Sequence, residues 1–63
     1  MDIASSITKL RTSRLHTRKA LAEKADIDLR HLIAVEEGRA VPTDYDIAAI
    51  SRALHVEPSD WIK

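Results

Sequence analysis

The segment 17–38 constrains the fold most, because it predicts two short, capped helices joined by a corner of about three residues. Thr17 is a good N-cap, since its hydroxyl can accept one of the free amide protons of a helix that begins at Arg18. That helix is predicted to run to about Ala25, and a second N-cap, Asp28, follows three residues later. The chain is therefore expected to turn sharply between two helices.

The corner and the end of the second helix each have a residue that tolerates the left-handed backbone conformation. Asp26 stands where the chain must turn, and aspartate is tolerated in the left-handed region of backbone conformation. The second helix is predicted from Leu29 to Glu37. It stops at Gly38, the only glycine of the chain, which suits the position after a helix where φ is positive. Together these signals predict a helix-turn-helix.

Apolar residues on both helices can face one another, with Ala22 small enough to permit a close crossing. The residues predicted to be buried there are Leu21, Ala22, Ala25, Ile27, Leu32 and Val35. Two large aliphatic side chains, Leu29 and Ile33, remain on the outer face of the second helix. Arg30, Ala34 and Glu37 share that face, and His31 lies at its edge.

One helix is predicted before this pair and two after it. Apolar residues recur at i, i+4 and i+7 as Ile3, Ile7 and Leu10, which predicts an amphipathic helix from about Asp2 to Arg14. No segment alternates with a period of two residues, so no strand is expected. The fold class is predicted to be all-α with five helices.

A capping box and a proline locate the two later helices. Thr43 and Asp46 can form a capping box, with aspartate in the place usually held by glutamate or glutamine. The buried stripe of that fourth helix is predicted as Ile47, Ile50 and Leu54. Pro58 suits the first position of a short last helix, from which Trp61 and Ile62 can close the core.

Composition excludes several classes of function. The chain has 63 residues, which suit a single domain over 1–63 but are too few to enclose a deep substrate pocket, so no enzyme is expected. There is no cysteine for a disulfide or a thiolate metal site. No signal peptide or membrane-spanning run is visible, which predicts a cytoplasmic protein. No cofactor motif is present, and His16, His31 and His55 lack metal-ligand spacing, so we expect exposed or capping histidines.

Charge is unevenly distributed although the net charge is zero. No acidic residue occurs from Ile3 to Ala22, whereas acidic residues outnumber basic ones after Arg39. The basic residues of the first stretch are Lys9, Arg11, Arg14, Arg18 and Lys19. This distribution is compatible with a surface that binds phosphates, and the alternative of ordinary solvated helix faces stays open.

From Leu10 to Val56 the chain resembles, without a gap, the helix-turn-helix of the phage repressor and Cro family, also called XRE-like. The resemblance is carried by Leu10, Arg11, Thr17, Leu21, Ala22, Ile27, Leu32, Val35, Glu36, Gly38, Pro42, Ile47, Ile50, Ala53, Leu54 and Val56, with Asp60, Trp61 and Ile62 matching the closing turn after one inserted residue. It implies a compact, five-helix, lambda-repressor-like domain whose helix-turn-helix core, 17–38, binds double-stranded operator DNA. It further implies a small transcriptional regulator, a repressor acting as a homodimer, with a dimer surface near Trp61 and the fourth helix.

The resemblance also implies roles for individual residues. Arg11 and Glu36 match a partly buried structural ion pair. The base-facing positions of the recognition helix are matched by Leu29, Arg30, Ile33 and Ala34. Contacts with DNA phosphates are expected from Arg18, Lys19, Arg39 and Arg14.

Departures from the family pattern support a second hypothesis. The family often has glycine where this chain has Leu15, Asp26 and His55, and a locally shifted end of the first helix would let Leu15 fill an apolar role. The recognition helix is poor in side chains that read base edges, and only Arg30 and His31 are candidates for that role. The alternative is an antiactivator- or antitoxin-like module that binds another regulatory protein through Leu29 and Ile33. Packing of these two residues under the first helix or against a dimer mate is equally open.

Overall fold

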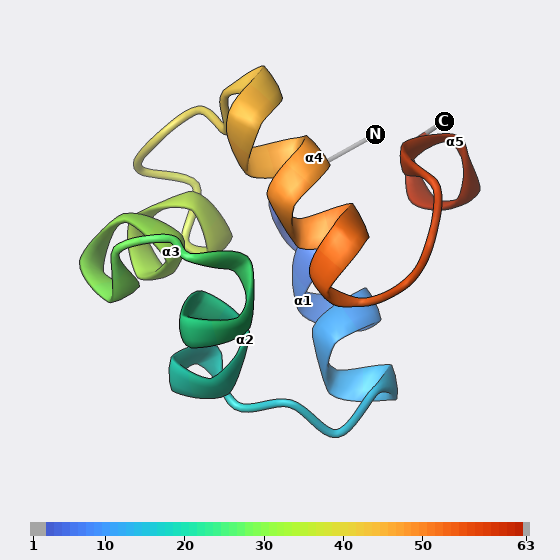
Figure 1. Cartoon of the computed structure of the whole chain (residues 1–63). Coiled ribbons are helices and arrows are strands. Elements are labelled where there is room, and N and C mark those ends of the chain that lie inside the picture. The colour runs from blue at the N-terminus through green and yellow to red at the C-terminus, as the bar shows by residue number, and fades with distance from the viewer. Residues whose placement is uncertain (1–2, 63) are drawn as a thin grey trace.

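In the computed structural model, which describes residues 3–62, five helices follow one another without a strand (Figure 1). They are α1 (Ile3–Ser13), α2 (Arg18–Ala25), α3 (Leu29–Glu36), α4 (Asp44–Ala53) and α5 (Pro58–Trp61). The predicted all-α fold class is confirmed for this part of the chain. The bounds of α2 are those predicted, whereas α3 ends one residue early and Glu37 caps it. The predicted start of α1 at Asp2 lies outside the described residues, and α1 ends at Ser13 instead of Arg14.

Three of the helices begin directly after a predicted N-cap residue. The Thr17 hydroxyl accepts the Ala20 amide at 3.0 Å, and Asp28 accepts the Arg30 amide at 2.8 Å. At the start of α4, Thr43 and Asp46 form the predicted capping box, with bonds of 3.1 and 2.9 Å. Each cap satisfies amide groups that have no partner inside their own helix.

Four helices end in the same way, with a residue in the left-handed region. Gly38 has φ of 79°, and the three non-glycine residues Leu15, Asp26 and His55 have φ of 60°, 58° and 58°. In each case the next residue donates its amide to the carbonyl five positions earlier, as in a Schellman motif. The sequence hypothesis that Leu15 fills an apolar role is wrong, because its side chain is 92% exposed and its backbone replaces the family's glycine.

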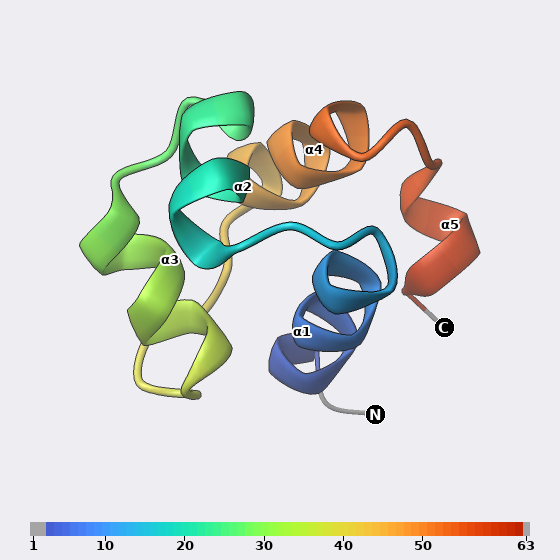
Figure 2. The same cartoon turned by 90° about the horizontal axis from the view of Figure 1, so that it is seen from below.

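The core lies where α1, α2, α3 and α4 meet, and α2 packs against both α3 and α4. Figures 1 and 2 show α3 and α5 at opposite ends of the molecule, with α2 and α4 between them. All six residues predicted at the helix-turn-helix crossing are buried. Ile50 and Leu54 are buried as predicted, but Ile47 is only partly buried, and Ala49 and Ala53 complete the inner face of α4.

The last helix closes the core as expected. Trp61 is buried, and its indole Nε1 donates a hydrogen bond of 2.9 Å to the hydroxyl of Ser51 in α4. This bond satisfies the polar end of a side chain whose remaining surface is apolar. Within residues 3–62 no helix is long and apolar enough to cross a membrane.

Candidate nucleic-acid interface

The corner between α2 and α3 projects α3 from the body of the domain. The amide of Ile27 donates to the carbonyl of Ala22 at 2.9 Å, which ends α2, and Asp28 starts α3 two residues after the left-handed Asp26. Leu32 and Val35 hold the inner side of α3 against the core. As a result α3 lies at one edge of the molecule with its other side toward solvent (Figure 2).

The four residues expected to face DNA bases share the outer side of α3. Leu29 is 37% exposed and Arg30 is exposed, whereas Ile33 and Ala34 are partly buried. Their spacing of i, i+1, i+4 and i+5 makes one continuous strip along the helix. Arg30 is the member of this strip that can donate hydrogen bonds from its side chain, so polar readout by the strip depends on it.

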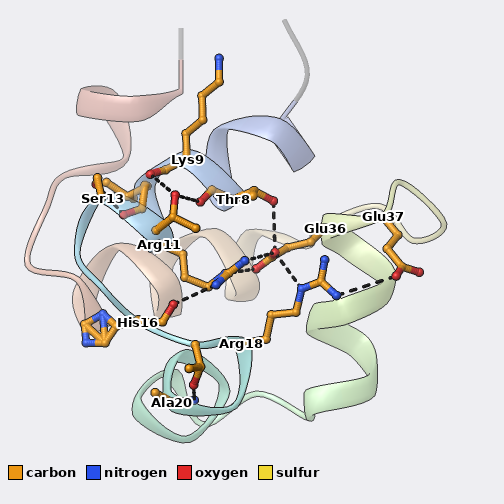
Figure 3. A network of polar contacts seen from close by, with 12 residues as sticks. Thr8, Lys9, Arg11, Ser13, His16, Arg18, Ala20, Glu36 and Glu37 are labelled. Carbon is orange, nitrogen blue, oxygen red and sulfur yellow. Dashed lines mark hydrogen bonds and ion pairs between the residues drawn. The ribbon is translucent and has the colours of Figure 1, made fainter.

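Behind this strip, a buried carboxylate joins the first three helices (Figure 3). The side chain of Glu36 in α3 is 0% exposed and accepts from Arg11 Nε in α1 at 2.9 Å. It also accepts from Arg11 Nη2 and from the Thr8 hydroxyl, both at 3.1 Å. Arg11 is thus placed as the resemblance implies, and its Nη1 also donates to the carbonyl of His16 at 2.8 Å. The bidentate geometry fixes the position of α3 relative to α1.

Arg18, expected to bind a phosphate, belongs to the same network. Its Nε donates to Glu36 at 3.1 Å, and its Nη1 lies 3.8 Å from the carboxylate of Glu37. Its side chain is still partly exposed at the beginning of α2. These two contacts were not predicted from the sequence, although the adjacent glutamates at the end of α3 are a signal for them.

The other three cations expected at phosphates are exposed, and two of them already have partners within the described residues. Lys19 is exposed on the first turn of α2. Arg39 is exposed, and it bonds to Glu37 at 2.8 and 3.0 Å. Arg14 is exposed but donates to the carbonyl of Leu54 at 3.1 Å, so it also ties the loop after α1 to the end of α4.

A further link, not predicted from the sequence, joins α3 to α4. The ring Nε2 of His31 lies 2.7 Å from a carboxylate oxygen of Asp46, the residue that completes the capping box. Burial by itself would raise the pKa of Asp46, but the bonds from Thr43 and the contact with His31 outweigh it and lower that pKa below its ordinary value. His31, which was expected to be exposed or capping, therefore connects α3 to the capping box at the start of α4. The residues are 15 positions apart, and no local pattern pairs them.

Tyr45 and His16 differ in their polar contacts. The Tyr45 hydroxyl donates to the carbonyl of Asp26 at 3.4 Å, beside the corner of the helix-turn-helix. His16 is partly buried, and its Nδ1 has no partner within the described residues. In residues 3–62 no group of three or more histidine and carboxylate side chains is arranged to hold a metal ion.

Comparison with known proteins agrees with this geometry. The sequence model of the family described as Helix-turn-helix matches residues 7–61, from the middle of α1 to the end of α5. No curated protein and no solved structure gives a match. The matched region includes the α2–α3 corner, the buried Arg11–Glu36 pair and the strip on α3. This chain belongs to the Cro/C1-type (XRE) helix-turn-helix family, whose domains bind DNA and are typically not enzymes.

Proposed function

We propose that this protein is a transcriptional regulator that places α3 in the major groove of an operator and reads it chiefly through Arg30. The observation that carries this proposal is the strip of Leu29, Arg30, Ile33 and Ala34 on the outer side of α3. An α-helix fits the major groove, where an arginine can bond to two acceptors of guanine and an aliphatic side chain can contact a thymine methyl. The start of α2, with Arg18 and Lys19, supplies cations and free amide groups for the DNA backbone.

The apolar residues of the strip are expected to contribute less to sequence selectivity than Arg30. Leu29 and Ile33 lie one helical turn apart, so they can contact neighbouring base pairs on either side of Arg30. Contacts with thymine methyl groups discriminate less than a bidentate hydrogen-bond pair. We therefore propose a short recognition sequence with one strongly specified guanine.

A dimer would supply the affinity that a single small domain lacks. We propose a two-fold dimer that contacts half-sites about 34 Å apart, one turn of DNA. The dimer interface is proposed at α5. There, Trp61 and Leu10 of α1 are among the residues that line a shallow groove of about 360 Å³. Light scattering after size exclusion, across a range of protein concentrations, measures the oligomeric state directly.

The test of DNA binding is fluorescence anisotropy of labelled duplexes, both generic and from the protein's own upstream region, at two salt concentrations. We expect Arg30→Ala to weaken binding to the preferred duplex by about 1–3 kcal/mol and to relax sequence preference. Arg18→Ala should weaken binding to all duplexes alike, and Lys19→Ala tests a phosphate contact without removing a bond to Glu36. Arg52→Ala, an exposed arginine in the last turn of α4, is the matched control.

Two outcomes would contradict the DNA assignment at different levels. An equal loss of affinity for unrelated duplexes in Arg30→Ala would show that Arg30 of α3 does not read base edges. No binding at tens of micromolar in low salt would favour the second candidate, a module that binds another regulatory protein. The 37% exposure of Leu29 beside Ile33 supports that candidate. Leu29→Asp should then abolish partner binding and leave helix content unchanged.

A further inference from the structure

Glu37 lies between two arginines at the end of α3. Its Oε1 accepts from Arg39 Nε at 3.0 Å and from Arg39 Nη2 at 2.8 Å. Its Oε2 lies 3.8 Å from Arg18 Nη1. Figure 3 shows Arg18 between the carboxylates of Glu36 and Glu37. One carboxylate therefore contacts two of the cations that are proposed to bind DNA phosphates.

The two neighbouring glutamates differ in what they can do to a ligand. The Glu36 side chain is 0% exposed, so its charge is enclosed by Arg11 and Arg18. The Glu37 side chain is 45% exposed, so its charge faces the solvent from which a phosphate would approach. Three arginines and two glutamates in this cluster leave one positive charge in excess, and neutralising Glu37 would leave two.

We infer that Glu37 restrains phosphate binding. In the free protein its carboxylate occupies the position between Arg18 and Arg39 that a DNA phosphate would take. This inference rests on the proposed function. A carboxylate and a phosphate present similar oxygen acceptors to a guanidinium group, and both are bound by its fork of donors. Binding of DNA then requires that the two arginines exchange Glu37 for a phosphate, and the displaced carboxylate repels the DNA backbone.

The restraint has a consequence for how the protein searches DNA. Phosphate contacts supply most of the non-specific affinity of a DNA-binding protein. A carboxylate that competes for two arginines lowers that affinity on every sequence, so the protein dissociates more readily from non-operator DNA. Glu37 is in this sense a determinant of affinity that touches no base.

The matched pair of variants is Glu37→Gln and Glu23→Gln. Both remove one negative charge and keep the shape of the side chain. Glu23 is exposed on α2, and within the described residues its carboxylate is paired with neither Arg18 nor Arg39. We expect Glu37→Gln to bind a generic duplex about 3- to 10-fold more tightly in low salt, since a carboxylate no longer faces the phosphates. The slope of log affinity against log salt should steepen by up to about 0.9, because the cluster then carries one more net positive charge toward the phosphates.

The double variant Glu37→Gln/Arg39→Ala tests whether Glu37 lowers the affinity for DNA through its contact with Arg39. The gain from Glu37→Gln should shrink in the Arg39→Ala background, because one of the two released arginines is then absent. Melting temperatures of all variants, followed by circular dichroism, verify that each is folded.

The outcomes separate this inference from the proposed function. A gain for Glu37→Gln that exceeds the gain for Glu23→Gln supports the restraint. Equal gains for the two variants, with wild type binding DNA, overturn it and leave only a general charge effect. No binding by wild type or by Glu37→Gln overturns the proposed function, and the restraint with it.

Discussion

Replacing Leu15 by glycine should stabilise this protein. Leu15 has φ of 60°, and a side chain with a Cβ in this region costs about 1–2 kcal/mol relative to its preferred conformations. Glycine avoids that cost but loses about 0.5–1 kcal/mol more in backbone entropy on folding. The side chain is 92% exposed, so its removal forfeits at most about 0.2 kcal/mol of burial. With the middle of each range, the net expectation is a gain of about 0.5–1 kcal/mol.

For a domain of this size, that gain corresponds to a rise in melting temperature of about 3–8 °C. Urea and thermal unfolding can be followed by far-UV circular dichroism and by the fluorescence of the single tryptophan, Trp61. Leu15→Ala is the control, because alanine removes the same exposed apolar surface but keeps the Cβ that makes φ of 60° unfavourable. We expect Leu15→Ala to change the free energy of unfolding by less than about 0.5 kcal/mol.

Two results would refute this reasoning. Equal stabilisation by glycine and alanine would show that the exposed leucine side chain, and not the backbone conformation, causes the instability. A loss of stability for Leu15→Gly would show that the loop after α1 does not hold this residue in the left-handed region.

Two further predictions concern the polar contacts of α3. Glu36→Gln should lower the free energy of unfolding by about 3–5 kcal/mol, because it leaves Arg11 without its buried charged partner. Glu37→Gln should change the free energy of unfolding by less than about 0.5 kcal/mol, because the Glu37 side chain is partly exposed. Similar midpoints of urea unfolding for the two variants would contradict the role of Glu36. Asp46 has a folded pKa below its ordinary value of 3.8, so its ionised form adds stability that is complete above that value and is lost as the pH falls through the folded pKa. Asp46→Asn should therefore flatten the fall in stability below about pH 4, and an unchanged slope in urea titrations at stepped pH would count against this linkage.

The order and the ends of the helices could be predicted because short-range interactions determine them. Thr17, Asp28 and Thr43 each bond to an amide two or three residues ahead, so the cap and its partner lie in one local sequence window. Asp26 and Gly38 were predicted at turns for a similar reason, since both tolerate positive φ. The positive φ of Leu15 was not predicted, because leucine itself gives no local signal for this backbone conformation.

The apolar spacing of the sequence by itself determined which faces of the helices are buried. Ile7, Leu21, Leu32 and Ile50 follow the helical period, and all four are buried, because burial of an amphipathic face needs only the correct periodicity. Only the tertiary structure decided how the charges are paired. Glu36 takes partners 18, 25 and 28 residues away, and His31 reaches Asp46 across 15 residues. Such pairs depend on the angle and distance at which the helices cross, and a periodic pattern contains neither. For that reason the sequence could indicate Arg18 and Arg39 as cations for DNA, while the fold revealed that Glu37 already lies between them.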